Sequence, residues 1–272
     1  MLTKITTTMQ RARAISRLGF YRSDRLYLFL WLFILPVYTR FGLSSWLRPP
    51  LVFNVCIAAR RTRISLSDPL ELVQLQMIFG AAEYKSTVDS AQYIIDLGGN
   101  IGLAALYFYD RFPSCQIHVY EPDPRTFAYL KRNTATCTDR ITLHQCAVAD
   151  VSGECTFYSH QRSESSSLHD RNGAVGVEVP VTTFDAIIES LGVPRIDIVK
   201  FDIEGAEGKV FGSATTMSRV KEFVGEFHHD LSPVSISDFA ANFSEFAVSY
   251  NADAHRRTFF RAKKETPHDI SG

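Results

Sequence analysis

Hydrophobic and polar positions follow two alternating patterns along residues 91–264. Short apolar runs such as "YIIDLG" and "IDIVKF" predict strands that are buried on both faces of a sheet. Segments between them, such as "PRTFAYLKRN", carry apolar residues three or four positions apart, as amphipathic helices do. Because strands and helices alternate, the pattern predicts an α/β fold with a doubly wound, mostly parallel sheet.

The end of this region departs from the alternation. The segments "FAVSYN" and "RRTFFRAKK" are typical of two strands close in sequence, which predicts an antiparallel hairpin. We therefore expect a seven-stranded Rossmann-like sheet with an antiparallel C-terminal edge strand. Residues 153–181 also begin and end like strands, around a serine-rich loop. This second hairpin is either simply solvated or forms part of the wall of a substrate pocket.

A different pattern precedes the main fold. The segment "LVFNVCIAARRTRISLS" predicts two strands around a basic turn that contains Arg60, Arg61 and Arg63. A helix is expected next, with Asp68 as its N-cap and Pro69 at its first position. The basic turn is either solvated or binds an acidic acceptor.

These patterns divide the chain into four predicted parts, and the first fifty residues are not explained by the main fold. The parts are a basic and apolar N-terminal helical extension (1–48), a strand-hairpin and helix module (49–90), the main α/β domain (91–264) and a disordered tail (265–272).

The N-terminal extension combines positive charge with an apolar run. Residues 1–25 carry six Lys and Arg side chains against one Asp, and residues 26–38 are uncharged and apolar. This run is shorter than the roughly 20 residues that a membrane-spanning helix needs. Three interpretations stay open: a helix that packs on the protein, peripheral contact with an anionic membrane surface, or a secretion signal. The third lacks a small-residue cleavage site.

Composition narrows the class of protein. Lys plus Arg equals Asp plus Glu at 29 each, so no net positive charge indicates nucleic-acid binding. The five cysteines are scattered and form no Cys-x-x-Cys pair, which is typical of reduced thiols and argues against a zinc site. The sequence therefore predicts a cytoplasmic protein without a nucleic-acid partner, with membrane association through residues 1–48 as the open alternative.

A glycine-rich turn connects the first strand of the main fold to its helix. In "YIIDLGGNIG", Gly98, Gly99 and Gly102 follow a buried strand and precede an amphipathic helix. Glycines in this position let a ligand approach the backbone closely, and a nucleotide binds at such a turn in doubly wound folds.

The residues around the turn indicate which nucleotide. Counted from Gly98, a dinucleotide motif G-x-G-x-x-G has Asn100 and Leu103 in its other two glycine positions, which is a poor match. Asp96 precedes the turn and disfavours a pyrophosphate, but it favours a cationic ligand. Glu121 follows at the interval of about 20 residues where such folds place the carboxylate that binds ribose. S-adenosylmethionine, a sulfonium nucleoside, fits this combination.

Four segments in order carry a resemblance to a known family. "IIDLGGNIGLAALYF", "VYEPDPRTFAYLKRN", "VPVTTFDAII" and "IVKFDIEGAEGKVF" together resemble the FkbM family of S-adenosylmethionine-dependent methyltransferases, from about residue 90 to residue 229. The resemblance implies O-methylation of a hydroxyl on a sugar, a glycolipid or a secondary metabolite. Gly99 departs slightly from the small residue that the family more often has after its first glycine.

The resemblance also implies cofactor-binding residues. Glu121 is expected to bind the ribose, Pro122 and Asp123 to shape the adenosine pocket, and Cys146 and Ala147 to lie near the adenine. The methionine side of the cofactor is expected at the turn, with cofactor-binding residues Asp96, Gly98, Gly99, Asn100, Ile101 and Gly102.

The catalytic residues are expected where the fourth and fifth strands end. Asp202, Glu204 and His228 are predicted to remove or receive the proton of the acceptor hydroxyl, without a metal. One alternative is a divalent metal held by the same three side chains. Another is structural: Glu204 and Glu207 complement the dipole of the following helix.

The same residues also bear on three alternative functions. A nicotinamide-dependent oxidoreductase requires the missing G-x-G-x-x-G motif, and a nucleic-acid methyltransferase is disfavoured by the zero net charge. A non-catalytic nucleoside-binding scaffold predicts a degraded turn, whereas this turn is intact. We therefore expect a methyltransferase whose partner is a small-molecule, glycan or glycolipid hydroxyl, and a lipid-linked acceptor is favoured if residues 1–48 contact a membrane.

Overall fold

The computed structural model describes residues 10, 12–40, 51–159, 175–251 and 257–264. The serine-rich loop and the tail predicted to be disordered (265–272) lie outside these described residues.

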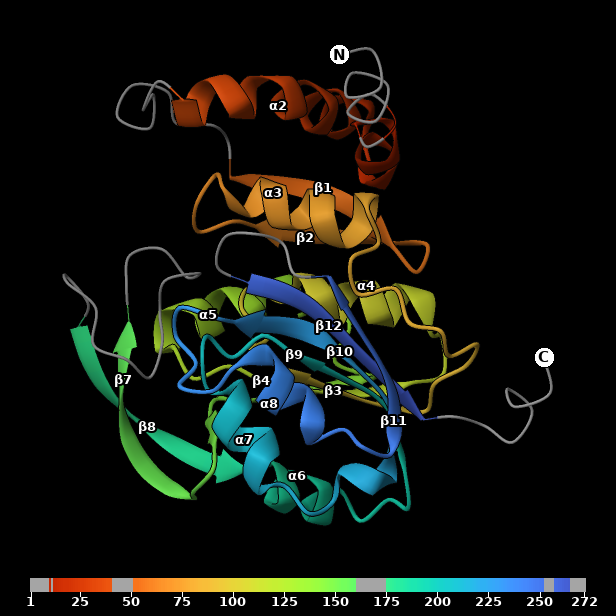
Figure 1. Ribbon diagram of the computed structural model, residues 1–272. Coiled ribbons are helices and arrows are strands. Elements are labelled where there is room, and N and C mark those ends of the chain that lie inside the picture. The colour runs from red at the N-terminus through yellow and green to blue at the C-terminus, as the bar shows by residue number, and fades with distance from the viewer. Residues whose placement is uncertain (1–9, 11, 41–50, 160–174, 252–256, 265–272) are drawn as a thin grey trace.

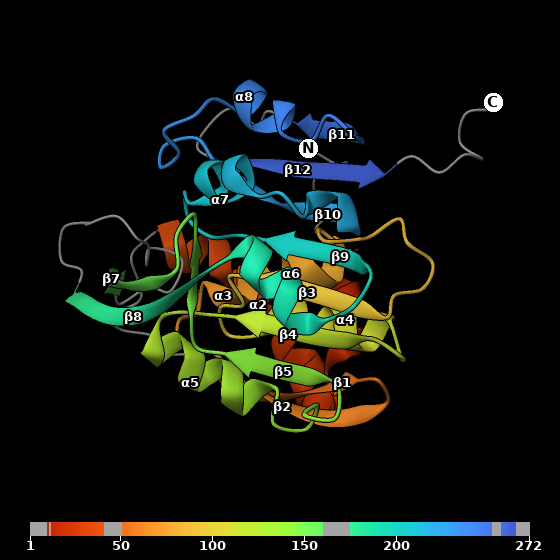
Figure 2. The ribbon, with the colours of Figure 1, turned by 90° about the horizontal axis from the view of Figure 1, so that it is seen from below.

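A seven-stranded mixed sheet forms the centre of the protein (Figure 2), which confirms the predicted α/β class and strand number. Five neighbouring strands run parallel because helices connect them. In spatial order the strands are β11 (Phe246–Asn251), β12 (Arg257–Lys264), β10 (Val220–His228), β9 (Ile196–Phe201), β3 (Tyr93–Leu97), β4 (Gln116–Tyr120) and β5 (Ile141–His144).

The C-terminal strand does not lie at the edge of the sheet, contrary to the prediction. β12 pairs antiparallel with β11, as the predicted hairpin requires, but it also pairs antiparallel with β10 on its other side. Thr258, Phe260 and Ala262 of this strand are completely buried. Pairing with β10 and β11 satisfies the backbone groups along both sides of β12, so β11, which exposes Tyr250, becomes the edge.

Helices cover both faces of the sheet (Figure 1). The helices are α4 (Leu103–Arg111) and α5 (Pro124–Asn133) on one face, and α6 (Phe184–Leu191), α7 (Glu207–Ser213) and α8 (Ile236–Ala241) on the other. Their ends carry the expected caps: Thr183 accepts a hydrogen bond from the backbone N–H of Ala186, and α6 ends at Gly192 as predicted.

The core on the α6–α8 side is rich in phenylalanine. Phe201 from β9, Phe211 from α7 and Phe223 from β10 are completely buried, with ring centroids 5.1 to 5.5 Å apart along the chain of contacts. Phe239 and Phe260 continue this cluster to β12. The edge-on contact of Phe201 with Phe211 packs the C-terminal end of β9, next to the candidate catalytic residue Asp202, against α7.

The third predicted strand, "ITLHQCAVA", divides into two. β5 ends at His144, the last residue that has a partner on β4 (Tyr120). The chain then leaves the sheet, and β6 (Ala147–Ala149) pairs with β8 (Val175–Thr183) of the predicted second hairpin. β7 (Gly153–Ser159) pairs antiparallel with β8, which confirms that hairpin.

The module before the main domain lies over α4 and α5 (Figure 1). β1 (Val52–Ile57) and β2 (Arg60–Ser65) pair antiparallel as predicted, but the turn consists of Ala58 and Ala59, both with positive φ. The arginines expected in the turn therefore lie on β2 instead.

The helix predicted from Pro69 begins later. α3 spans Glu71–Leu75 and continues into one π-helical turn, η2 (Gln76–Gly80). Asp68 still accepts a hydrogen bond from a backbone N–H, that of Leu70, and Glu71 accepts from Ser67. These bonds satisfy backbone donors just before the helix, which begins two residues later than expected.

The N-terminal extension contains α2 (Arg22–Arg40), which lies above β1 (Figure 1). Leu28 and Trp31 are buried, and the ring of Tyr27 lies 5.7 Å from that of Phe53 on β1. No helix in the described part of the chain combines the length and the apolar character that crossing a membrane requires.

Candidate functional site

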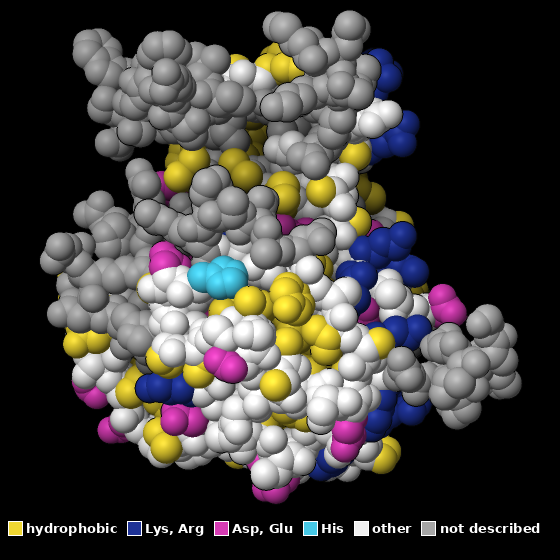
Figure 3. Space-filling view, viewed as in Figure 1, with side chains coloured by type: hydrophobic (Ala, Val, Ile, Leu, Met, Phe, Trp, Pro, Cys, Tyr) yellow, Lys and Arg dark blue, Asp and Glu magenta, His cyan; other side chains and the backbone are white. Residues whose placement is uncertain are grey.

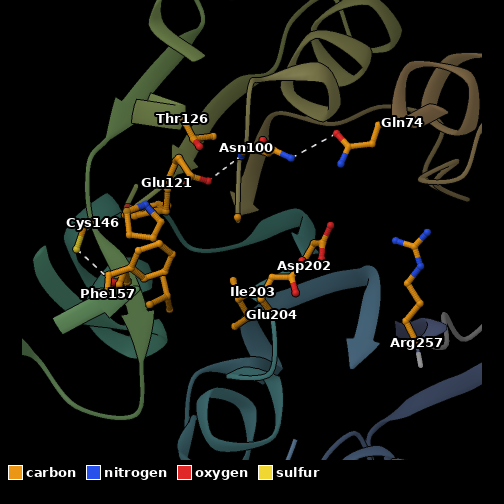
Figure 4. Close-up of a pocket in the computed structure, with 15 residues that line it drawn as sticks. Gln74, Asn100, Glu121, Thr126, Cys146, Phe157, Asp202, Ile203, Glu204 and Arg257 are labelled. Atoms are coloured by element: carbon orange, nitrogen blue, oxygen red, sulfur yellow. Dashed lines mark hydrogen bonds between the residues drawn. The ribbon is translucent and has the colours of Figure 1, made fainter. Parts of the chain in front are cut away.

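Two adjoining pockets lie at the carboxyl ends of the parallel strands, where doubly wound folds bind their ligands. They share Gln74, Gly98, Asn100, Asp202 and Arg257, so the two spaces meet at the glycine turn and at the end of β9. Figure 4 shows the first pocket, with Glu121 and Asn100 on one side and Asp202 and Glu204 on the other.

The glycine turn is held tightly against its neighbours. The backbone N–H groups of Gly98 and Gly99 both donate to the carbonyl oxygen of Tyr120, at 3.0 and 2.9 Å. Gly98 has φ +77°, and a Cβ added there would lie 1.9 Å from the carbonyl oxygen of Asp202. A side chain at this position would therefore push β3 and the Asp202 loop apart, so the glycine sets the spacing across the pocket floor.

Asp96 lies beneath the turn rather than on its surface. It is completely buried and lines neither pocket, and its carboxylate lies 3.0 Å from the ammonium group of Lys200. Lys200 also donates to the carbonyl oxygen of Gly98 at 2.6 Å. The pair thus supports the turn from below. The sequence-based assignment of Asp96 to the methionine side stays a prediction, and the structure assigns its charge a protein partner.

Asn100 and Glu121 connect the turn to the end of β4. Asn100 has φ +47°, a conformation that Asn tolerates better than most residues, and its N–H donates to Glu121 at 2.8 Å. The other oxygen of Glu121 accepts from the N–H of Asp123 at 2.9 Å. The side-chain oxygen of Asn100 is buried and has no hydrogen-bond partner among the described residues.

Burial is the main influence on the ionisation of Glu121. Its pKa is raised from 4.5 to about 7, because desolvation outweighs the two backbone hydrogen bonds. Glu121 nevertheless lines the first pocket, as does Pro122, so a ligand hydroxyl in that pocket can donate to this carboxyl group.

Three predicted cofactor residues have local structural roles. Asp123 is buried and caps α5 by accepting from the N–H of Arg125, and Ile101 belongs to the hydrophobic core. Gly102, with φ +92°, is the N-cap of α4. None of the three lines the first pocket, although Ile101 lines the second.

The hydrophobic side of the first pocket lies beyond Glu121. Cys146 and Ala147, both expected near an adenine, line it. Val148 on β6 and Phe157 on β7 line it too. The sequence analysis assigned no site role to Val148, and it gave the hairpin that contains Phe157 only a general role as a pocket wall. The signal that could have identified Phe157 is its aromatic ring, which lies on β7, two residues after Cys155, and offers a flat surface to a base.

The three predicted catalytic side chains come together. Nε2 of His228, at the end of β10, lies 3.6 Å from Asp202 Oδ1 and 3.9 Å from Glu204 Oε2. Its other ring nitrogen, Nδ1, lies 2.8 Å from Oε1 of the completely buried Glu207, which orients the imidazole. Glu226 contributes a fourth carboxylate, 4.0 Å from Nε2.

These carboxylates determine the charge of His228. Burial alone lowers the pKa of the imidazole, but the hydrogen bond and charge of Glu207 and the charges of Asp202 and Glu204 together raise it to about 10. An imidazolium is therefore present near neutral pH when no other cation binds. In that state the carboxylates, and not His228, are the better proton acceptors.

The second pocket extends from Asp202 toward the 49–90 module. Leu70, Val73 and Met77 provide an apolar wall from α3, its start and η2, and sequence reasoning assigned them no site role. Glu83 and Tyr84 follow η2, and the Tyr84 hydroxyl donates to Asp202 Oδ2 at 3.4 Å. Opposite this wall, Arg257 on β12 lies 2.8 Å from Glu226.

Comparison with known protein families agrees with this geometry. The family model for the Methyltransferase FkbM domain matches residues 96–262, which is more than half of the chain. The chain belongs to this family.

Individual relatives are more distant. Over 137 residues the chain is 28% identical to Methyltransferase 1 of Beauveria bassiana, covering 42% of this chain and 55% of that one. It is 25% identical over 152 residues to the 2-O-methyltransferase NoeI of Sinorhizobium fredii, covering 49% and 62%. The matched parts are thus less than two thirds of each relative's length.

Among solved structures, the chain is similar to a precorrin-6y C5,15-methyltransferase from Geobacter metallireducens. The TM-score is 0.44 at 11% sequence identity, and the match covers 70% of this chain and 88% of that one.

Proposed function

We propose that this protein is an S-adenosylmethionine-dependent O-methyltransferase. The observation that carries the proposal is the pairing of an intact glycine turn and a buried Glu121 with a carboxylate and imidazole cluster across the same pocket. The matched FkbM domain and the 2-O-methyltransferase NoeI support the reaction class. A non-catalytic scaffold would not need the cluster, so this alternative is not favoured.

The residues present fit the nucleoside part of this cofactor. Glu121 offers carboxylate oxygens to two ribose hydroxyls, and the apolar surface of Ala147, Val148 and Phe157 suits a flat base. The buried side-chain oxygen of Asn100 requires a donor, which the ammonium group of a methionine moiety provides. The bound cofactor supplies an electrophilic methyl group.

Asp202 and Glu204 act on the acceptor in this proposal. They hold the acceptor hydroxyl at the junction of the two pockets, and one of them receives its proton as the oxygen–methyl bond forms. The cofactor would supply the methyl group and keep the electron pair of the broken carbon–sulfur bond on its sulfur. His228 stabilises the ionised carboxylates, and Glu207 keeps its ring in place.

The second pocket supports an acceptor with both a polar and an apolar part. Glu83, Glu226 and Arg257 present hydrogen-bonding groups suited to a polyol, whereas Val73 and Met77 present apolar surface. We therefore propose a hydroxyl of a sugar, a glycolipid or a comparable secondary metabolite as the methyl acceptor.

We also propose that α2 places the protein against an anionic membrane surface. Leu26, Leu30, Phe33 and Ile34 are exposed and recur at helical spacing, so they form one apolar stripe. Figure 3 shows Lys and Arg side chains grouped along one side of the molecule. Cosedimentation with phosphatidylserine vesicles tests this: Leu30→Glu should reduce binding, and equal sedimentation of both proteins would contradict the proposal.

Calorimetry with S-adenosylmethionine, with NAD as the control ligand, is the first test of the reaction class. Saturable binding of S-adenosylmethionine and no binding of NAD is the expected result. Transfer of a labelled methyl group to a panel of glycans and glycolipids then identifies the acceptor. A folded sample that binds neither nucleotide would refute the proposed function.

A further inference from the structure

We propose that Asp202, Glu204 and His228 form a binding site for one divalent transition-metal ion at the junction of the two pockets. Each residue offers one ligand atom, and these atoms all lie within 4.8 Å of one another. The binding site itself is independent of the proposed reaction. The role given to the ion below rests on the proposed function.

The spacing of the ligand atoms suits one shared metal ion, which would displace the proton of the His228 imidazolium and replace its ion pairs with the two carboxylates. His228 Nε2 lies 3.6 Å from Asp202 Oδ1 and 3.9 Å from Glu204 Oε2, beyond hydrogen-bond distance. Metal bonds of about 2.0 to 2.2 Å to nitrogen and oxygen place two ligands of one ion roughly 3 to 4 Å apart. The two distances from His228 therefore suit ligands of one ion, and all three ligand atoms lie within 4.8 Å of one another.

The surroundings orient the ligand atoms toward a common point. The His228 side chain is 8% exposed, and Glu207 holds its Nδ1 so that Nε2 faces the carboxylates. A carboxylate on the distal nitrogen is the usual support of a metal-binding histidine. Tyr84 donates to Asp202 Oδ2, and the buried Oδ1 has no hydrogen-bond partner among the described residues.

The donor set indicates the kind of ion. One imidazole favours Zn²⁺, Fe²⁺ or a similar ion over Mg²⁺ or Ca²⁺, and two carboxylates also suit Mn²⁺. Three protein ligands leave at least one coordination position for water or substrate, as in catalytic metal sites. Mn²⁺ satisfies both kinds of ligand and is the probe of choice because it is paramagnetic.

The position of the site gives the ion a role in methyl transfer. Asp202 and Glu204 line the first pocket, and Asp202 also lines the second, so the open coordination position faces the proposed acceptor hydroxyl. A bound ion would lower the pKa of a coordinated hydroxyl, so that its proton passes more readily to Asp202 or Glu204, the proton acceptors of the proposed function. The nucleophile then forms without a strong protein base.

The test is Mn²⁺ binding to the full chain after removal of metals with a chelator. Electron paramagnetic resonance of free Mn²⁺ should show one bound ion per chain, and Asp202→Asn and Glu204→Gln should each weaken binding at least about tenfold. Both substitutions keep the size of the side chain. Glu245→Gln, which removes an exposed carboxylate far from the pockets, should bind Mn²⁺ as wild type does.

Pulsed resonance supplies a direct signature. The bound Mn²⁺ should show coupling to an imidazole nitrogen, and His228→Gln should abolish it. Calorimetry with S-adenosylmethionine on the same samples separates the two proposals. A wild-type sample that binds S-adenosylmethionine but no Mn²⁺, or an Asp202→Asn variant with wild-type Mn²⁺ affinity, overturns the metal site alone. Mn²⁺ binding without any S-adenosylmethionine binding supports the site and refutes the reaction.

Discussion

Replacing Glu121 by Gln should affect stability and cofactor binding in opposite directions. The substitution removes a carboxyl group that is 7% exposed and whose folded-state pKa is about 7. Gln has nearly the same shape and still accepts one of the two hydrogen bonds that Asn100 and Asp123 donate. The main change is therefore the loss of an ionisable group from a buried position.

The magnitude follows from the difference between the two pKa values. An unfolded chain has the ordinary value of 4.5, and the folded value is about 7, so ionisation above pH 7 costs the native state about 3 kcal/mol at 1.36 kcal/mol per pKa unit. Because the folded pKa is raised, this cost is absent below pH 4.5, where the carboxyl group is protonated in both states. The cost develops as the pH rises through 7, so native stability falls over this range. Glu121→Gln has no such loss.

Urea unfolding of both proteins at intervals from pH 4.5 to pH 8 measures this effect. The free energy of unfolding of Glu121→Gln, relative to wild type, should rise by about 3 kcal/mol across this range. The lost hydrogen bond lowers the variant's stability by a constant amount of about 1 kcal/mol, which does not change with pH. Glu189→Gln on the exposed surface of α6 is the matched control and should show no such trend.

Calorimetry at pH 8 should show that the same substitution weakens the binding of S-adenosylmethionine. Hydrogen bonds to a charged group contribute about 1.5 to 3 kcal/mol, so Glu121→Gln should bind S-adenosylmethionine about 10- to 100-fold more weakly. A stability difference that is constant with pH would refute the reasoning about burial. Unchanged affinity for S-adenosylmethionine would refute the assignment of Glu121 to the ribose.

Two further substitutions test the support of the glycine turn, both by urea unfolding. Gly98→Ala should destabilise the protein by at least about 2 kcal/mol, because its Cβ would meet the carbonyl oxygen of Asp202 and its φ is positive. Lys200→Met should cost about 3 to 5 kcal/mol, because it leaves the buried Asp96 without its ion-pair partner. Asp96→Asn added to Lys200→Met should recover part of that loss.

Controls for these substitutions come from the same fold. Gly212→Ala in α7 has only an ordinary contact at 3.9 Å in the described structure and should be neutral or stabilising. Equal effects of Gly98→Ala and Gly212→Ala would contradict the role given to the Asp202 carbonyl. A double variant of Lys200 and Asp96 no more stable than Lys200→Met would contradict the ion-pair argument.

Local sequence patterns predicted the central sheet because they act over short distances. "YIIDLGGNIG" predicts a strand, a turn and a helix start from local spacing alone, although Tyr120 and Lys200 hold the turn in place. The grouping of Asp202, Glu204 and His228 was also predictable, because parallel strands bring their carboxyl ends to one edge of the sheet.

The structural features that the sequence did not predict depend on contacts between distant segments of the chain. The partner of Asp96 is Lys200, about a hundred positions further along, and no local pattern distinguishes this pair from Lys200 with Glu226. β12 lies inside the sheet because both β11 and β10 pair with it. The pairing with β10 joins segments that are distant in the sequence. The break after His144 reflects the length of β4, not the residues at the break.

The two pockets are lined by different elements, which contacts between distant segments of the chain bring together. The first pocket, proposed above to bind the cofactor, is lined in part by the ends of β3 and β4 and their turns, and Lys200 and Tyr120 hold the glycine turn from two sides. The wall of the second pocket comes instead from α3 and η2, a short helix and one π-helical turn outside the main sheet. Under the proposed function, substitutions at Val73 or Met77 are expected to change the acceptor preference without contacting Glu121, which lines only the first pocket.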